Sequence, residues 1–260
     1  MSYAVSALFW TLGLFLGMLL FLEIGRRIGE RWLAKDSDAA RQGVGAVEGS
    51  VFGLLGLLVA FTFSGAGTRF DQRRHLIVEE TNAIGTAYLR LDVLPSTVQP
   101  ALRDSFRRYL DSRLAIYRKL PDAAAAKEEL ARSNQLQGEI WRLGVTAVKA
   151  EGAPPSAAML LLPALNAMFD ITTIRVMATQ VHPPEIVFVM LFGLALLASL
   201  LAGYGMAGGK VRKWLHMIGF ALIMAVSVYV ILDLEFPRLG LLRVQFFDQA
   251  LVELRESMNR

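Results

Sequence analysis

Four stretches of the chain are apolar for long enough to cross a bilayer, and charged or amphipathic segments separate them. A helix needs about 20 mainly apolar residues to span the hydrocarbon core. The first stretch is followed by Glu23 and Arg26 rather than by a small-residue cleavage site, so we expect a retained span and not a signal peptide. The pattern predicts membrane-spanning helices over residues 4–22, 45–66, 186–206 and 214–234.

The segment between the second and third spans has no comparable apolar run and no alternation typical of strands. It predicts helices, the first of them continuous with span two as far as Leu94-Pro95. The predicted fold class is an all-α membrane protein with four transmembrane helices plus a helical extramembrane domain between spans two and three. The expected division is 1–67 for transmembrane helices one and two, 68–183 for the helical extramembrane domain, 184–236 for transmembrane helices three and four, and 237–260 for a C-terminal amphipathic tail.

Lysine and arginine gather in the two short loops, between spans one and two and between spans three and four. Short cytoplasmic loops are enriched in these residues, so both loops are expected in the cytoplasm. The extramembrane domain would then face the periplasm, with the chain as a multi-pass protein of a bacterial inner membrane. Arg69, Arg73 and Arg74, just beyond span two, favour the opposite orientation, and that alternative stays open.

The composition excludes several kinds of site. The chain has no cysteine, which rules out disulfides, thiolate metal sites and thiol catalysis. The three histidines are not at ligand spacing, so no metal is expected. The net charge of +4 comes without a nucleic-acid-binding motif, and the signatures of nucleotide loops, serine hydrolases and zinc proteases are missing. We expect no enzyme activity, no cofactor and no nucleic-acid partner.

Glu48 lies one turn inside the apolar end of span two, on a helix that carries a face of small residues. An ionisable side chain in a membrane helix needs either a protein partner or water. In one interpretation the small face packs against a neighbouring helix and Glu48 pairs with a nearby arginine. In the other, a symmetric oligomer brings copies of Glu48 into a carboxylate ring that favours cations, and Glu23 can join either arrangement. The small face consists of Gly45, Gly49, Gly53 and Gly56, and the candidate arginines are Arg26, Arg27 and Arg41.

Large apolar side chains lie on another face of span two: Phe52, Leu55, Val59 and Phe63. In an oligomer they would form an apolar constriction that gates by dewetting. The alternative is contact with lipid or with other helices, which is the usual role of apolar residues in a span.

The helix beyond span two carries a polar stripe at steps of three or four residues. Such a stripe is usually the solvated face of a helix. Here it could also meet polar residues on the helix that leads to span three, either as a buried network or as a ligand site, and Arg90 with Asp170 is the pair we would test. The network candidates are Glu79, Asn82, Thr86 and Arg90 on the stripe, and Asn166 and Asp170 on the later helix.

Two acids, Asp233 and Glu235, close the fourth span. With Arg69 or Arg238 nearby they would make an ion-pair cluster at the membrane interface. A calcium site needs several oxygen ligands at once, and only these two acids are close in sequence, so no metal site is predicted.

Residues 48–95, which begin EGSVFGLLGLLVAFTFSGAGTRFDQRR, resemble a bacterial membrane family described as bestrophin-like, and ILDLEFPRLG at 231–240 resembles its closing motif. The resemblance implies a four-span helical protein related in plan to bestrophins, which are pentameric anion channels with the second span lining the pore. Residues 241–260 lack the acidic calcium-binding cluster that bestrophins carry after their last span.

The predicted function is an oligomeric ion channel with span two lining its pore. The expected partners are the lipid bilayer, small inorganic ions and further copies of the chain, five if it follows the bestrophins. A Glu48 ring would favour cations and the resemblance favours anions, so selectivity stays open. The alternative is a non-conducting membrane scaffold or sensor whose helical domain binds a ligand or an envelope partner. It predicts a dimer or a monomer in which the glycine face of span two is buried against the protein's own spans.

Overall fold

The computed structural model describes residues 3–32, 38–120, 122–208, 214–241 and 245–259. Within these ranges the chain is all-α and has no strand. The α-helices are α1 (Tyr3–Trp32), α2 (Asp38–Leu89), α3 (Gln99–Arg118), α4 (Ala123–Ala147), α5 (Ser156–Ala178), α6 (Glu185–Gly205), α7 (Trp214–Glu235) and α8 (Gln249–Ser257). Short 3-10 helices are η2 (Arg90–Val93), η3 (Met206–Gly208) and η4 (Gln245–Asp248).

Helix α2 is a single helix of 52 residues, which confirms that span two continues into the polar stripe without a break. Its interior contains no proline. The helix tightens into η2 and ends at Leu94, which has an extended backbone with φ −87° and ψ 157°. A residue that precedes proline is pushed out of the helical region by the proline ring, so Pro95 explains this stop.

The chain divides into two compact units. The first contains residues 1–69 and 182–241, and the second contains residues 70–181 and 242–260. Helix α2 contributes to both units, because the division falls between Arg69 and Phe70.

In the first unit α1 packs closely against α6 at two glycines. A Cβ atom added to Gly25 would lie 1.9 Å from the carbonyl oxygen of Leu200, and one added to Gly203 would lie 2.0 Å from that of Leu22. Such a distance is far inside van der Waals contact, so each position tolerates only glycine. Small residues let membrane helices approach backbone to backbone, and dispersion contacts then hold them together.

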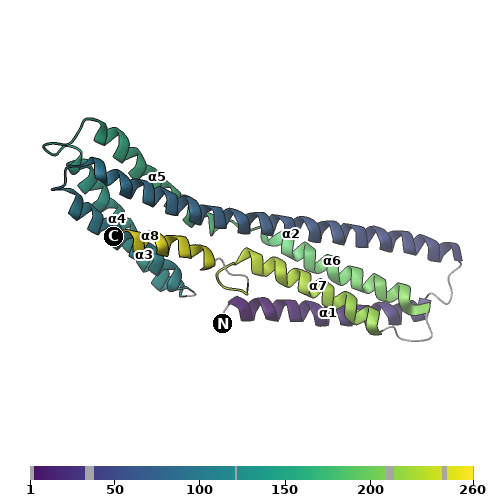
Figure 1. The fold of residues 1–260 in the computed structure, drawn as a ribbon. Helices are drawn as coiled ribbons and strands as arrows, with labels where there is room; N and C mark the ends of the chain where they lie inside the picture. Colours follow the sequence, from purple (N-terminus) through teal and green to yellow (C-terminus); the bar gives the residue numbers. More distant parts are fainter. Residues whose placement is uncertain (1–2, 33–37, 121, 209–213, 242–244, 260) are drawn as a thin grey trace. The chain divides into compact units, whose positions relative to one another are not determined.

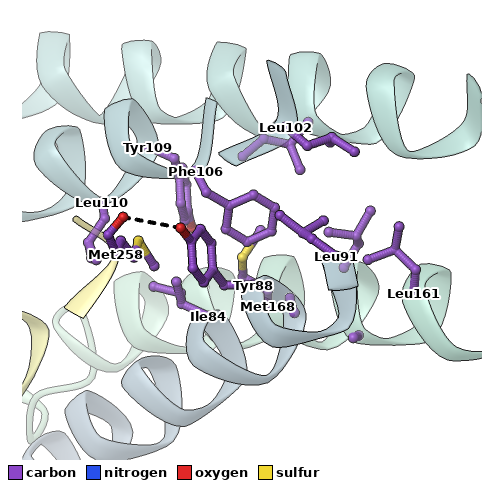
Figure 2. Packing of buried hydrophobic residues seen from close by; sticks show 14 of the residues in the cluster. Ile84, Tyr88, Leu91, Leu102, Phe106, Tyr109, Leu110, Leu161, Met168 and Met258 are labelled. Atoms are coloured by element: carbon purple, nitrogen blue, oxygen red, sulfur yellow. Dashed lines mark hydrogen bonds between the residues drawn. The ribbon is translucent and has the colours of Figure 1, made fainter. Parts of the chain in front are cut away.

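The second unit has its own hydrophobic core, built from α2, η2, α3, α4, α5 and α8. Figure 2 shows its centre, where the Tyr88 ring packs edge-on to Phe106 with ring centroids 5.8 Å apart. The Tyr88 hydroxyl donates to the carbonyl oxygen of Met258 at 3.2 Å, which ties α8 to α2. Ile84 is completely buried beside the Tyr88 ring, and Leu161, also completely buried, lies farther along the core next to Leu91.

Five described helical segments are long and apolar enough to cross a membrane, one more than the sequence pattern predicted. The additional segment is α5. It carries Asp170 and Arg175, and it contributes Leu161, Leu165 and Met168 to the core of the second unit. Length and hydropathy alone do not separate a buried core helix from a span, so the number of four spans stays a prediction.

Candidate functional site

One stripe of α2 faces the other helices of the first unit. Leu55, Thr62 and Ala66 recur at helical spacing and are at most 6 % exposed. Phe52 lies on the same stripe and packs edge-on to Phe220 of α7, with ring centroids 5.9 Å apart. This side of α2 is therefore occupied within the protomer.

A second side of α2 is open. Cβ atoms added to Gly45, Gly49, Gly53 or Gly56 would meet no atom of the described chain within 4 Å. The glycine face that the sequence identifies is thus not packed against the described spans of its own protomer. The scaffold alternative required the opposite arrangement.

A third side, opposite the occupied stripe, presents large apolar residues. Leu54 is 54 % exposed, Leu57 is 51 % exposed and Phe61 is 68 % exposed. Ser50 and Ser64 extend this side in both directions and are also exposed. Side chains at this spacing share one face of an α-helix.

The structure does not bring the four predicted constriction residues onto one open face. Phe52 and Leu55 point into the protomer, Val59 is half-buried, and Phe63 is 48 % exposed. The four residues share one helix face, and so do Leu54, Leu57 and Phe61, so helical spacing alone could not tell which apolar face is open.

Glu48 lies against the end of α6. A Cβ atom added to Gly205 would be 2.9 Å from Oε2 of Glu48, so a larger residue there would displace the carboxylate. Its Oε1 atom is buried and has no hydrogen-bond partner among the described residues. A buried carboxylate oxygen without a partner carries the full cost of desolvation.

The arginines of α1 bind other acids. Arg26 donates from Nε to Glu23 at 3.1 Å and also pairs with Glu30, while Arg27 donates from Nε to Glu23 at 2.9 Å. The predicted pairing of Glu48 with either arginine is therefore wrong, because Glu23 and Glu30 lie on the same helix face one turn away. The side chain of Arg41, the third candidate, lies outside the described residues.

Glu235 anchors a charged cluster where α2 leaves the first unit. Its side chain is completely buried, and Arg69 donates from Nε to both of its carboxylate oxygens, at 2.9 and 3.1 Å. His182 Nδ1 lies 3.4 Å from Glu235 Oε2, and the His182 ring stacks on Phe236. Of the two arginines expected near the closing acids, Arg69 binds Glu235.

The other closing acid, Asp233, holds the turn that follows α7. It is 2 % exposed, and its Oδ1 accepts a hydrogen bond from the backbone nitrogen of Leu241 at 2.8 Å. A Cβ atom added to Gly240 would lie 1.6 Å from the same oxygen, so the turn requires glycine there. Both acids thus have structural partners, and the described residues contain no group of three or more histidine or acidic side chains arranged to hold a metal.

The polar stripe of α2 lines two grooves against α5 in the second unit. One has a volume of about 260 Å³ and is lined by Asn82, Thr86 and Arg90, among others. The other has a volume of about 680 Å³ and is lined by His75 and Glu79 together with apolar residues of α5. The stripe is therefore neither a simple solvated face nor a buried network.

The predicted partners of the stripe lie apart from it. Arg90 donates to the carbonyl oxygen of Leu160 at 2.6 Å, and within the described chain it makes no ion pair with Asp170. Asn166, Asp170, Glu79, Asn82 and Thr86 are all exposed. No network joins these six residues, because α2 and α5 diverge enough to leave the grooves between them.

The buried network of the second unit is centred on Glu80, which sequence reasoning missed. Glu80 is completely buried, and it pairs with Arg113 of α3 and Arg175 of α5. Arg175 also pairs with Asp248 at 3.2 Å, so two acids face two guanidinium groups. The sequence signal for this network is the spacing of Arg113, which lies four residues after Tyr109 on the face of α3 that packs into the core.

Arg113 stays charged in this core. Burial by itself lowers the pKa of the Arg113 guanidinium, but the neighbouring Tyr117 and Glu80 outweigh burial and raise that pKa above its ordinary value. The Tyr117 hydroxyl accepts a hydrogen bond from Arg113 Nη2 at 3.0 Å. The network is a permanent set of paired charges and carries no proton in or out near neutral pH.

Comparison with known proteins assigns this architecture. The model of the Bestrophin-like domain matches residues 11–246. Two solved structures of a bacterial bestrophin homologue from Klebsiella pneumoniae, each with a single substitution, have the same fold with a TM-score of 0.61 and 14 % sequence identity. The alignments cover 92 and 97 % of this chain and 98 and 97 % of the homologue. No curated protein matches.

The family match confirms the resemblance seen in residues 48–95 and 231–240. Together with the apolar helices it makes the chain a multi-pass membrane protein. With the match extending over 11–246, the chain belongs to the Bestrophin-like family.

Proposed function

We propose that the protein is an oligomeric ion channel of the bacterial inner membrane, with α2 lining the pore, and that it transports ions rather than catalysing a reaction. The observation that carries the proposal is the unequal packing of α2. One stripe is buried in the protomer, while the glycine face and the Leu54–Leu57–Phe61 face are open.

A ring of protomers gives each of these sides a role. The buried stripe holds α2 to its own protomer, the glycine face accepts the α2 helix of a neighbour, and the side opposite the buried stripe faces the axis. The pore lining is then Ser50, Leu54, Leu57, Phe61 and Ser64, in place of Phe52 and Leu55. Leu54, Leu57 and Phe61 form an apolar constriction that gates by dewetting.

This arrangement bears on selectivity. Glu48 belongs to the stripe that turns toward α6, and the proposed lining from Ser50 to Ser64 carries no charge. A carboxylate ring at the axis is thus disfavoured, and anion transport, as in the bestrophins, becomes the selectivity to test first. Reversal potentials of the wild type and of Glu48→Gln decide it, since a cation filter loses its preference when the carboxylate is removed.

The periplasmic placement of the second unit gains support from its arginines. Arg73 is buried and donates to the carbonyl oxygens of Ala178 at 3.1 Å and Val181 at 3.0 Å, while Arg69 binds Glu235. Both side chains have partners inside the protein, which accounts for their position without a cytoplasmic loop. Fusions of alkaline phosphatase and of a fluorescent protein at the α3–α4 turn test the orientation.

Ion flux from liposomes tests the channel. We expect purified wild type to conduct, and Phe61→Ala to conduct several-fold faster because the constriction widens. Phe52→Ala is the matched control, since the Phe52 ring packs against Phe220 and its removal leaves the pore lining intact. Protein of confirmed oligomeric mass that releases no common ion above empty vesicles would contradict the proposal.

A further inference from the structure

The larger groove of the second unit combines apolar and acidic side chains on an exposed face. It lies between α2 and α5 and has a volume of about 680 Å³. On its α5 side Ile174, Met177 and Val181 are 52, 55 and 57 % exposed. Apolar surface that remains uncovered at this density marks an interaction site.

The acid that lines this groove is Glu79. The other exposed acids on residues 70–89 and 156–178 are Asp71 and Asp170, and no lysine occurs in either segment. Two arginines lie beside these acids. Arg74 pairs with Asp71 at 2.9 Å and stacks on the Phe247 ring at 4.2 Å, and Arg90 binds the carbonyl oxygen of Leu160.

Helix α4, in the same unit, presents the opposite charge. Lys127, Arg132, Arg142 and Lys149 are exposed along residues 123–149, with Glu128 as the exposed acid. Within the described chain Lys127, Arg142 and Lys149 form no ion pair. On the helix face that carries Lys127 and Arg142, the residues between these two cations are small or uncharged polar: Ala131, Asn134, Gln135 and Gly138. A Cβ atom added to Gly138 would meet no described atom within 4 Å.

We propose that α4 of one protomer docks into the α2–α5 groove of the next. The inference rests on the proposed oligomer and names its contact. Every copy carries both surfaces on different helices, so the contact is head-to-tail and propagates around a ring. Lysine and arginine bring cations to Glu79 and Asp170, and their aliphatic stems cover Ile174 and Met177.

A protein surface suits this groove better than lipid does. Glu79 lines the groove among apolar residues, and Asp170 is exposed on α5 one helical turn before the lining residues Thr173 and Ile174. An acid that faces hydrocarbon without a partner is costly. The basic face of α4 supplies that partner, and the contact neutralises the positive charge of α4 as well. Complementary fields of this kind fix the register between subunits.

Cross-linking tests the contact directly, because the chain has no cysteine of its own. Two differently tagged single-cysteine chains, Thr173→Cys in the groove and Arg142→Cys on α4, are co-expressed and treated with a short bismaleimide. We expect a product that carries both tags, and from a chain with both substitutions a ladder that ends at the ring size. Glu256→Cys, exposed on α8, replaces Arg142→Cys in the matched control.

Charge reversal provides a second measurement. Glu79→Lys with Asp170→Lys should lower the cross-linked yield about tenfold, the effect of losing two exposed ion pairs and adding repulsion. Adding Lys127→Glu and Arg142→Glu to the same chain should restore the cross-linked yield. In this chain the α4 cysteine is moved to Gln135.

The outcomes separate this inference from the channel. An assembly that keeps its oligomeric mass but gives no more product than the Glu256→Cys control overturns the docking surface and leaves the channel standing. A monomeric mass in mild detergent and in native membranes overturns the proposed oligomer, and the docking surface with it.

Discussion

Arg113 donates a hydrogen bond from Nε to Oε1 of Glu80 at a distance of 2.5 Å, and neither side chain has any exposed surface. Arg175 binds the other carboxylate oxygen from α5. One glutamate of α2 thereby holds α3 and α5 together in the core of the second unit. Two cations around one acid need a further negative charge, which Asp248 of η4 provides.

Removing the central acid should unfold the second unit far more easily. We expect Glu80→Gln to lower the free energy of unfolding by about 3–5 kcal/mol, because two buried guanidinium groups lose their counter-charge. Denaturant unfolding followed by tryptophan fluorescence, with Trp141 in this unit as reporter, measures the change.

The matched control is Asp71→Asn, which breaks an exposed pair with Arg74 one turn away on the same helix. Exposed pairs contribute little, so its unfolding midpoint should stay close to that of the wild type. Equal midpoints for Glu80→Gln and Asp71→Asn would mean that the buried network does not stabilise the fold.

The Glu80 network also shows what the sequence pattern could not reveal. Helical periodicity located the spans and the unbroken α2, because burial of apolar faces dominates both. It identified Glu79 instead of Glu80, since adjacent residues on a helix differ by about 100° in direction and only the tertiary structure decides which is buried. The partners Arg113 and Arg175 are 33 and 95 residues away in sequence.

The faces of α2 illustrate the same limit. The residue types in span two predicted a glycine face and an apolar face, and both exist. Which of these faces is open depends on the side of α2 that α6 and α7 cover, and helical periodicity does not contain that information. Phe52 and Leu55 therefore lie against the protomer, although they belong to an apolar helix face that predicted a constriction.

Two glycines should respond oppositely to the same substitution. Gly203→Ala places a Cβ 2.0 Å from the Leu22 carbonyl oxygen and should separate α1 from α6, which lowers the yield of folded protein severely. Gly53→Ala meets open space in the protomer, so the folded protomer should survive. We expect Gly53→Ala to weaken the oligomer instead.

Size-exclusion chromatography with mass measurement, together with thermal melting in detergent, distinguishes these outcomes. Gly53→Ala protein with wild-type melting and a wild-type oligomer would show that the open glycine face is not a helix–helix contact. Gly13→Ala, which also meets open space but lies on α1, is the control for a general effect of alanine.

The hairpin of α3 and α4 should lose stability in acid. A hydrogen bond from Lys119 lowers the pKa of Glu129, and one from Arg108 lowers the pKa of Glu139, both from the ordinary value of 4.5. The unfolded chain then binds more protons than the folded one as pH falls. The stabilisation from these two carboxylates is complete at pH values above their ordinary pKa, and it is lost as the pH falls through their lowered pKa values.

Unfolding midpoints measured from pH 7 down to pH 3 check this expectation. The double variant Glu129→Gln and Glu139→Gln should show a shallower fall below pH 4.5 than the wild type. Glu151→Gln, exposed in the loop after α4, should leave the fall unchanged. A double variant with the same acid profile as the wild type would refute the assignment.

The Glu235 cluster should show a graded response to three substitutions at Arg69 and His182. Arg69→Met leaves a completely buried carboxylate without its cation, so we expect a loss of about 3–5 kcal/mol in the first unit. Arg69→Lys should lose less, because the ammonium group keeps the charge but cannot bind both oxygens as the planar guanidinium does.

His182→Phe should cost least. In the wild type the His182 and Phe236 ring centroids lie 4.4 Å apart, and a phenylalanine ring can keep this stacking. The substitution gives up the 3.4 Å contact between His182 Nδ1 and Glu235. Thermal melting in detergent ranks the three variants, and the predicted order of stability is His182→Phe, then Arg69→Lys, then Arg69→Met. If His182→Phe melted at or below Arg69→Met, the histidine and not the arginine would hold Glu235, because the substitution that removes the principal counter-charge of a buried carboxylate destabilises the fold most.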